Sequence, residues 1–167
     1  SGSMNSADKL PLLKSSLKLL VNEMREQDRI SLVTYADGTR VALPPTSGNE
    51  KATINAAIDA LRSSGSTAGA SGIQLAYSAA QQSFIKGGIN RILLATDGDF
   101  NVGISDDRQL KSMIEEKRKS GISLSTLGFG TGNYNEAMME QIADVGDGAY
   151  SYIDSLMEGH KVLVNEM

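Results

Sequence analysis

Hydrophobic residues repeat with a helical period near the start of the chain. Over residues 8–26 they recur at steps of three and four, which predicts an amphipathic helix with these residues on its buried face: Leu10, Leu13, Leu17, Leu20, Val21 and Met24. Pro11 falls in the first turn, where the amide hydrogen that proline lacks is not needed. Similar patterns predict further helices over residues 49–61, 68–85, 106–120, 135–145 and 155–167. Asn135 is expected to cap the helix at 135–145.

Short apolar runs between these helices predict strands. They are "RISLVTYA" (29–36), "TRVAL" (39–43), "NRILLAT" (90–96), "ISLSTLGFG" (122–130) and "AYSYI" (149–153). Asp37-Gly38 is typical of a tight hairpin turn, so the second strand is expected to be antiparallel, at an edge of the sheet, and ended by Pro44-Pro45. The run at 90–96 is apolar without alternation, as in a parallel strand buried on both faces.

The alternation of helices and strands predicts an α/β fold. We expect a doubly wound, mostly parallel sheet with helices on both faces and one short antiparallel edge strand. Such a sheet normally starts with a central strand, but this chain starts with "SGSM" and a helix. Each neighbouring backbone group left buried without a partner would cost about 1–3 kcal/mol. We therefore expect something to fill the place of the first central strand.

Composition narrows the functional classes. The 167 residues, 40% of them hydrophobic and 22% charged, suffice for one globular domain with a core. The net charge of -4 is scattered and leaves no basic stripe for nucleic acid, and no apolar run approaches the roughly 20 residues of a membrane helix. The absence of cysteine excludes thiol chemistry. The single histidine, His160, has no obvious companions for a catalytic triad and is expected on the surface.

An acidic cluster, "TDGDFN", follows the strand predicted at 90–96. Asp97-x-Asp99-x-Asn101 matches the first half of an EF-hand calcium loop, but Val102 and Arg108 stand where that loop needs a glycine and a glutamate. A second alternative is a metal-assisted phosphohydrolase with Asp97 as nucleophile and Asp99 as acid/base. The later strand ends, "GFGTGNYN" and "IDSL", contain no lysine and one carboxylate, which argues against that chemistry.

A third alternative combines the cluster with distant loops. Ligands of open α/β sheets gather at the carboxyl ends of the strands, where "SGS" at the start and "GSTAG" (65–69) supply hydroxyls. Ser1, Ser3, Thr67 and Asp97 are hard oxygen donors that suit magnesium, manganese or calcium. Taken singly, Thr67 could cap the following helix, and Asp97 and Asp99 could stabilise a turn.

These three segments resemble the metal-ion-dependent adhesion site of von Willebrand factor type A domains. The family's motif is Asp-x-Ser-x-Ser, a distant Thr and a distant Asp. "DKLPLLKSSLKLLV", "GSTAGASGIQLAY" and "RILLATDGDFNVGISD" resemble bacterial members described as calcium-activated chloride-channel-like proteins. The resemblance implies a Rossmann-like fold, a single domain over 1–167, and Ser1, Ser3, Thr67 and Asp97 as the metal ligands. It assigns no role to Asp99.

The resemblance implies a binding module without catalytic activity. A divalent cation, Mg²⁺ in the first place and Ca²⁺ or Mn²⁺ otherwise, would capture a Glu or Asp carboxylate of a partner protein. A location in the cell envelope or outside the cytoplasm is also implied. The family's first ligand, an Asp two residues before Ser1, and the strand that carries it lie outside the chain. The domain is therefore expected to be truncated at its amino end, unless another segment supplies the strand. Two alternatives remain: "SGS" precedes a natural start at Met4, or the module is structural with a vestigial metal site.

Overall fold

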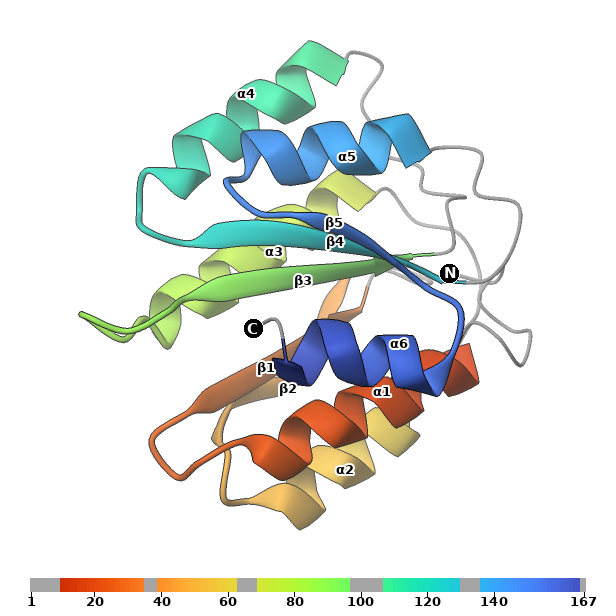
Figure 1. The fold of residues 1–167 in the computed structure, drawn as a ribbon. Helices are drawn as coiled ribbons and strands as arrows, with labels where there is room; N and C mark the ends of the chain where they lie inside the picture. Colours follow the sequence, from red (N-terminus) through yellow and green to blue (C-terminus); the bar gives the residue numbers. More distant parts are fainter. Residues whose placement is uncertain (1–9, 35–38, 63–68, 97–106, 130–135, 166–167) are drawn as a thin grey trace.

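The described strands form two separate sheets in the computed structural model (Figure 1). The structure describes residues 10–34, 39–62, 69–96, 107–129 and 136–165.

The larger sheet is parallel, as predicted. It consists of β3 (Arg91–Thr96), β4 (Ser123–Phe129) and β5 (Tyr150–Ile153), with β4 in the middle. Thr96 is paired with Gly128 on β4, and Phe129 with Ile153 on β5, so the carboxyl ends of all three strands lie at one edge.

The smaller sheet is the predicted antiparallel pair, but its second strand is longer than expected. β1 (Arg29–Thr34) pairs with β2 (Arg40–Ser47), which continues through Pro44-Pro45, so the prediction that these prolines end the strand is wrong. Ile30 pairs with Thr46 and Leu32 with Leu43, so the two prolines lie opposite the single residue Ser31 in a bulge. A bulge tolerates proline because the extra residue forms no ladder hydrogen bond. The turn residues Asp37-Gly38 lie outside the described residues.

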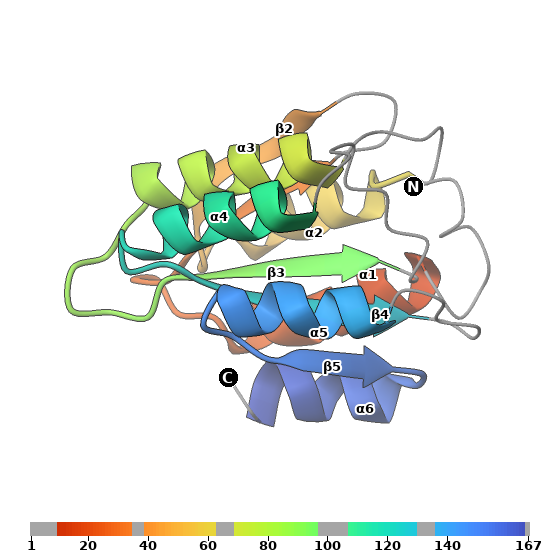
Figure 2. The ribbon, with the colours of Figure 1, turned by 90° about the horizontal axis from the view of Figure 1, so that it is seen from above.

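The helices cover both faces of the sheets, which confirms the predicted fold class (Figures 1 and 2). α3, α4 and α5 lie on one face of the parallel sheet, and α1 and α6 lie on the other. α2 packs against α1 and β2. The helix bounds are α1 (Leu10–Glu23), α2 (Lys51–Asp59), α3 (Gly69–Gln82), α4 (Asp107–Arg118), α5 (Glu136–Val145) and α6 (Leu156–His160), followed by the π-helical η2 (Lys161–Asn165).

The C-terminal element departs from the single helix predicted at 155–167. Ser155 caps α6 by accepting a hydrogen bond from the Glu158 amide, 3.2 Å away, but the helix changes to a π-helical turn after His160. That turn buries Val162 and Leu163 against the sheet. The His160 side chain is exposed, as predicted. The proposed Asn135 cap of α5 lies outside the described residues.

Three apolar clusters hold these layers together. One lies between the parallel sheet and α3, α4 and α5, a second between that sheet and α1 and η2, and a third among α1, α2, β1 and β2. Lys51 stabilises the end of α1, because its ammonium group donates to the carbonyls of Val21 (2.7 Å), Met24 (2.9 Å) and Gly48 (3.2 Å). Val21 lies in the last turn of α1, where its carbonyl also accepts from the Met24 amide at 3.1 Å.

Tyr77 makes the first cluster sensitive to alkaline pH. Its side chain on α3 is fully buried, and its hydroxyl has no hydrogen-bond partner among the described atoms. Burial raises the pKa of the phenol to about 12, above its ordinary value of 10.0. Between these two values the unfolded chain loses the proton first, so stability falls as pH rises from 10 to 12.

We expect Tyr77→Phe to reduce this alkaline loss of stability. Phenylalanine keeps the ring and removes the titrating group, and at pH 8 it should be at least as stable because an unpaired buried hydroxyl is gone. Urea unfolding of both proteins at pH 8, 10 and 11 measures the effect. An identical decline in the two proteins would contradict it.

Candidate metal-binding edge

The carboxyl ends of the parallel strands and the amino ends of the helices lie on the same side of the molecule. β3, β4 and β5 all end at this side, and α1, α3, α4 and α5 begin there (Figures 1 and 2). This arrangement follows from the β-α-β order of the chain: each strand ends where the next helix starts. We call this side the carboxyl edge.

The four predicted metal ligands lie outside the described residues, but the elements that flank them end at the carboxyl edge. Asp97 directly follows Thr96, the last residue of β3, and Thr67 is two positions before Gly69, the first residue of α3. Ser1 and Ser3 precede α1, which begins at Leu10. In the sequence, Asp97 and Thr67 therefore lie within two positions of elements that end or begin at the carboxyl edge, and Ser3 lies seven positions before α1. The convergence of these four side chains at the carboxyl edge stays a prediction.

The composition of this predicted ligand set fits a hard divalent cation. Three hydroxyls and one carboxylate supply oxygen donors only, and a low ligand charge leaves the ion attractive to a further carboxylate. Within the described ranges, no group of three or more His, Cys, Asp or Glu side chains could hold a metal ion. The described part of the chain therefore offers no competing metal centre.

A perturbed carboxyl group lies at the other end of the strands. Asp28, just before β1, accepts a hydrogen bond from the backbone amide of Arg25 at 2.8 Å. This bond, helped by the Arg25 guanidinium, keeps the pKa of Asp28 below its usual value despite partial desolvation. The group stabilises the turn between α1 and β1, so we assign it no role in binding.

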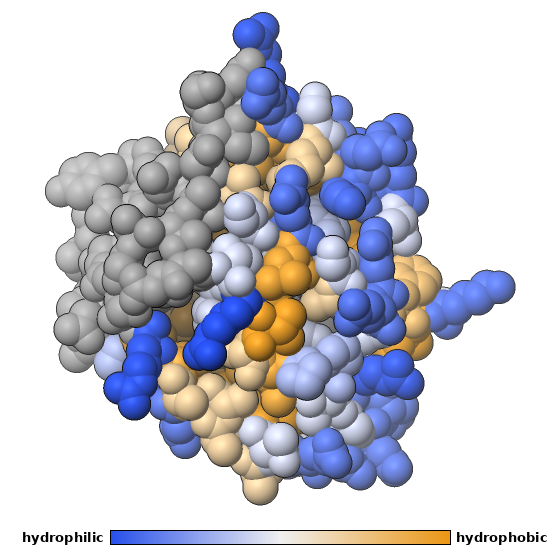
Figure 3. Space-filling model, turned by 180° about the vertical axis from the view of Figure 1, so that it is seen from behind, coloured by the Kyte–Doolittle hydropathy of each residue, from blue (hydrophilic) through white to orange (hydrophobic). Residues whose placement is uncertain are grey.

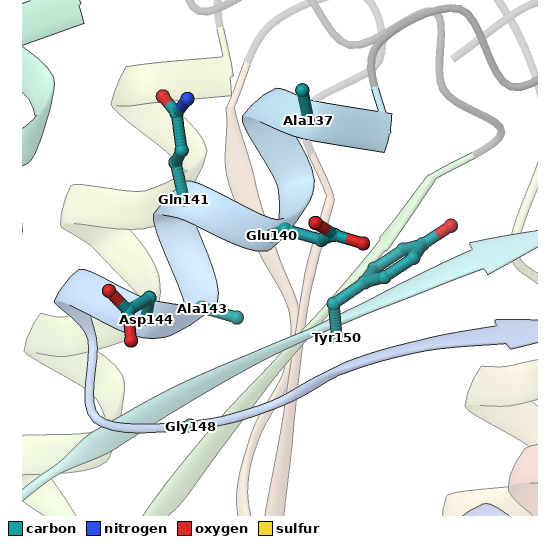
Figure 4. A pocket seen from close by; sticks show the side chains of 7 residues that line it. All are labelled: Ala137, Glu140, Gln141, Ala143, Asp144, Gly148 and Tyr150. Carbon is teal, nitrogen blue, oxygen red and sulfur yellow. The ribbon is translucent and has the colours of Figure 1, made fainter.

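A shallow depression between α5 and β5 also lacks the geometry of a site. It measures about 550 Å³ and is lined by Glu140, Gln141, Asp144, Gly148 and Tyr150, among others. The Glu140 carboxylate points toward the Tyr150 ring, whereas Gln141 and Asp144 point away from it (Figure 4). The two carboxylates do not converge, which argues against a metal or acid/base pair here.

Comparison with known proteins identifies the family. The sequence profile of the von Willebrand factor type A domain matches residues 1–165. The chain belongs to this family. It is 64% identical over all 167 residues to "Uncharacterized protein YfbK" of Escherichia coli (strain K12). The chain spans 29% of the length of that relative, so its family domain corresponds to a minor part of it.

Solved structures share the fold of this type A domain. An aerotolerance-related membrane protein from Bacteroides fragilis superposes with a TM-score of 0.79 at 23% identity, covering 100% of this chain and 95% of that one. Proximal thread matrix protein 1 from the mussel byssus, with a zinc-occupied adhesion-site motif, superposes with a TM-score of 0.69 at 21% identity. That match covers 98% of this chain and 43% of the mussel protein. The narrower likeness to chloride-channel-like members stays a prediction.

Proposed function

We propose that the chain is a metal-dependent protein-binding module of the adhesion type. The observation that carries the proposal is the position of the flanking elements: α1 and α3 begin and β3 ends at the carboxyl edge, and the predicted ligands precede or follow these elements in the sequence. The family supports the same function, because a protein with the same fold, the mussel matrix protein, holds zinc at its own adhesion-site motif.

Each predicted ligand has a defined part in this proposal. The hydroxyls of Ser1, Ser3 and Thr67 would hold the cation as neutral donors, and Asp97 would supply the negative charge, directly or through water. When bound, the cation would offer an open coordination position to a Glu or Asp carboxylate of a partner protein. Neutral donors favour this capture because they leave much of the positive charge for the incoming carboxylate. Mg²⁺ is the first candidate, with Ca²⁺ and Mn²⁺ as alternatives.

The rest of the proposal concerns the parent protein. Residues 1–167 form one domain of it, with no catalytic residue assigned and no nucleic acid partner. None of the described helices combines the length and apolar character needed to cross a lipid bilayer. The likeness to a membrane protein of Bacteroides fragilis supports a location at the cell envelope.

We expect Asp97→Asn to lower the affinity for Mg²⁺ or Mn²⁺ by about 100-fold. Loss of an outer-shell partner alone costs a metal site about 10–100-fold, and Asp97 carries the charge of the predicted set. Calorimetric titration of the full-length natural polypeptide with each metal measures the change. Asp99→Asn is the matched control, because it removes a carboxylate from the same segment that the proposal does not use.

Binding of an acidic peptide completes the test. The unsubstituted protein should bind a Glu-containing peptide immobilised on a surface only when Mg²⁺ or Mn²⁺ is present, and a chelator or Asp97→Asn should abolish the binding. Unchanged binding in a folded Asp97→Asn or Thr67→Ala protein would refute the proposal. Magnesium-dependent turnover of a phosphate ester, lost in Asp97→Asn, would establish the phosphohydrolase instead. Absence of any calorimetric signal would indicate a vestigial site.

A further inference from the structure

Two consecutive apolar residues at the start of α6 face solvent. Leu156 is 48% exposed and Met157 is 83% exposed. The described residues include further exposed large apolar side chains at separate positions of the chain: Val41, Phe84 and Ile89. The back of the molecule also shows hydrophobic residues between hydrophilic ones (Figure 3). Single exposed apolar residues are ordinary on a protein surface, whereas a neighbouring pair is more typical of a contact surface.

The turn that carries the pair is held by hydrogen bonds. The Ser155 hydroxyl accepts from the Glu158 amide at 3.2 Å, and the Ser155 carbonyl accepts from the Gly159 amide at 3.0 Å. Gly159 faces α1, because a Cβ added to it would overlap the Ser16 hydroxyl. Residues two positions apart on a helix are about 200° apart, so Met157 is directed away from α1. The apolar pair is therefore ordered before a partner binds, which lowers the entropic cost of binding.

The pair lies close to the carboxyl edge. β5 ends there at Ile153, and α6 begins three residues later (Figure 1). Two strand spacings, about 10 Å, separate the ends of β5 and β3, and three residues of chain add at most about 10 Å. Leu156 is therefore within about 20 Å of Thr96, the residue before Asp97. An extended peptide covers this distance in about three to six residues.

Two carboxylates accompany the apolar pair. Asp154 is exposed just before α6, and Glu158 follows Met157 and is half-buried. Neither carboxylate forms an ion pair within the described part of the chain. The exposed cation Lys161 begins η2, one turn further from the carboxyl edge. A basic group of a partner would therefore be attracted to the end of α6 that is nearest to this edge.

We infer that Leu156 and Met157 form a second contact for the partner whose carboxylate the metal captures, an inference that rests on the proposed function. The segment of the partner that fits carries a large apolar side chain next to a lysine or arginine, about three to six residues from the Glu or Asp at the metal. The apolar side chain packs on the pair, and the basic group lies near Asp154. The metal can hold any accessible carboxylate, so the second contact supplies the discrimination between partners.

Three synthetic peptides test the inference by their affinity for the full-length natural polypeptide in the presence of Mg²⁺. Each contains one Glu for the metal and, about four residues from it, either Leu-Lys, Leu-Gln or Ser-Gln. The Leu-Lys peptide should bind about tenfold more tightly than the Ser-Gln peptide, because a leucine side chain is buried only in the first complex. The Leu-Gln peptide should bind about threefold less tightly than the Leu-Lys peptide, because an exposed ion pair adds little. Fluorescence anisotropy measures the three dissociation constants.

Substitution of the pair locates the contact. Met157→Ser should reduce the preference for the Leu-Lys peptide to less than about threefold and leave the calorimetric affinity for Mg²⁺ unchanged. Ile89→Ser is the matched control, because Ile89 is 79% exposed but lies before the amino end of β3, at the opposite edge of the sheet. It should change neither affinity. Both side chains are exposed, so both variants should fold as the unsubstituted protein does.

The outcomes separate this inference from the proposed function. Absence of metal-dependent binding for all three peptides would refute the proposed function and the inference with it. Metal-dependent binding of equal affinity, or a preference for leucine that Met157→Ser leaves undiminished, would overturn the inference alone. Self-association of the polypeptide that Met157→Ser abolishes would also overturn it, by assigning the pair to a second copy.

Discussion

Phe129→Ala is expected to lower the free energy of unfolding by about 3–5 kcal/mol. The ring is fully buried in the cluster between the parallel sheet and α1 and η2, beside Leu13, Leu127 and Ile153. Alanine would remove most of the side chain from a site enclosed by three elements, which cannot all move inward to fill the space. The cost therefore includes both the lost burial and a cavity.

The position of Phe129 connects this cost to the predicted function. It is the last residue of β4 and pairs with Ile153 at the carboxyl edge, next to the end of β3 at Thr96. A loosened edge should also weaken metal binding, although Phe129 contributes no ligand.

Urea unfolding measures the loss of stability, and calorimetry measures the metal affinity. Phe84→Ala is the matched control, because the Phe84 ring is 42% exposed and its removal should cost less than about 1 kcal/mol. Similar costs at the two positions would show that the site around Phe129 collapses onto the smaller side chain.

Periodicity was sufficient to predict the architecture of this chain. All five strands and six helices predicted from apolar spacing occur in the structure, with ends shifted by a few residues. The errors lie where tertiary contacts override local preference. Pro44-Pro45 continue β2 because a bulge opposite Ser31 accommodates them. The π-helical turn at 161–165 accompanies the burial of Val162 and Leu163, which no local signal encodes.

From the sequence, the metal site could be predicted only as three loop segments that are connected to particular helices and strands. The rule that ligands gather at the carboxyl ends of parallel strands correctly located the end of β3 and the start of α3 at one edge. It could not show whether Ser1, Ser3, Thr67 and Asp97 converge, because loop conformation depends on local contacts that spacing does not record. The sequence also gave no sign of Lys51, whose three carbonyl contacts depend on residues up to 30 positions away.

The sequence also led us to expect an unfilled place in the sheet, where the first central strand of the fold class would lie. The sequence started with a helix where the fold class requires a strand, and the structure has a groove between β1 and β3 at that place. No described strand joins β1 to β3 across this groove.

Gly148→Ala should destabilise the fold by about 3 kcal/mol, through steric overlap and lost hydrogen bonds. Gly148 lies in the tight connection between α5 and β5, where its amide donates to the Ala143 carbonyl at 2.8 Å. A Cβ atom there would overlap the Leu124 carbonyl oxygen and lie 2.6 Å from both the Leu124 carbonyl carbon and the Ser125 hydroxyl. Two of these atoms belong to the backbone of the central strand and cannot move without disturbing the sheet.

The hydrogen bonds around Gly148 make relief of this overlap costly. The adjacent Ala149 amide donates to the Ser125 hydroxyl at 3.2 Å, and its carbonyl accepts from the Thr126 amide at 3.1 Å. Moving the connection away from β4 would strain these bonds and the start of β5.

Gly87→Ala is the control that separates steric overlap from the loss of glycine's conformational freedom. Gly87 has a φ of 80°, and no atom lies near a Cβ added there. The substitution should therefore lower the free energy of unfolding by about 1 kcal/mol. Thermal and urea unfolding of the two variants should therefore rank Gly148→Ala well below Gly87→Ala in stability. The reverse order would mean that the connection can shift away from β4 at little cost.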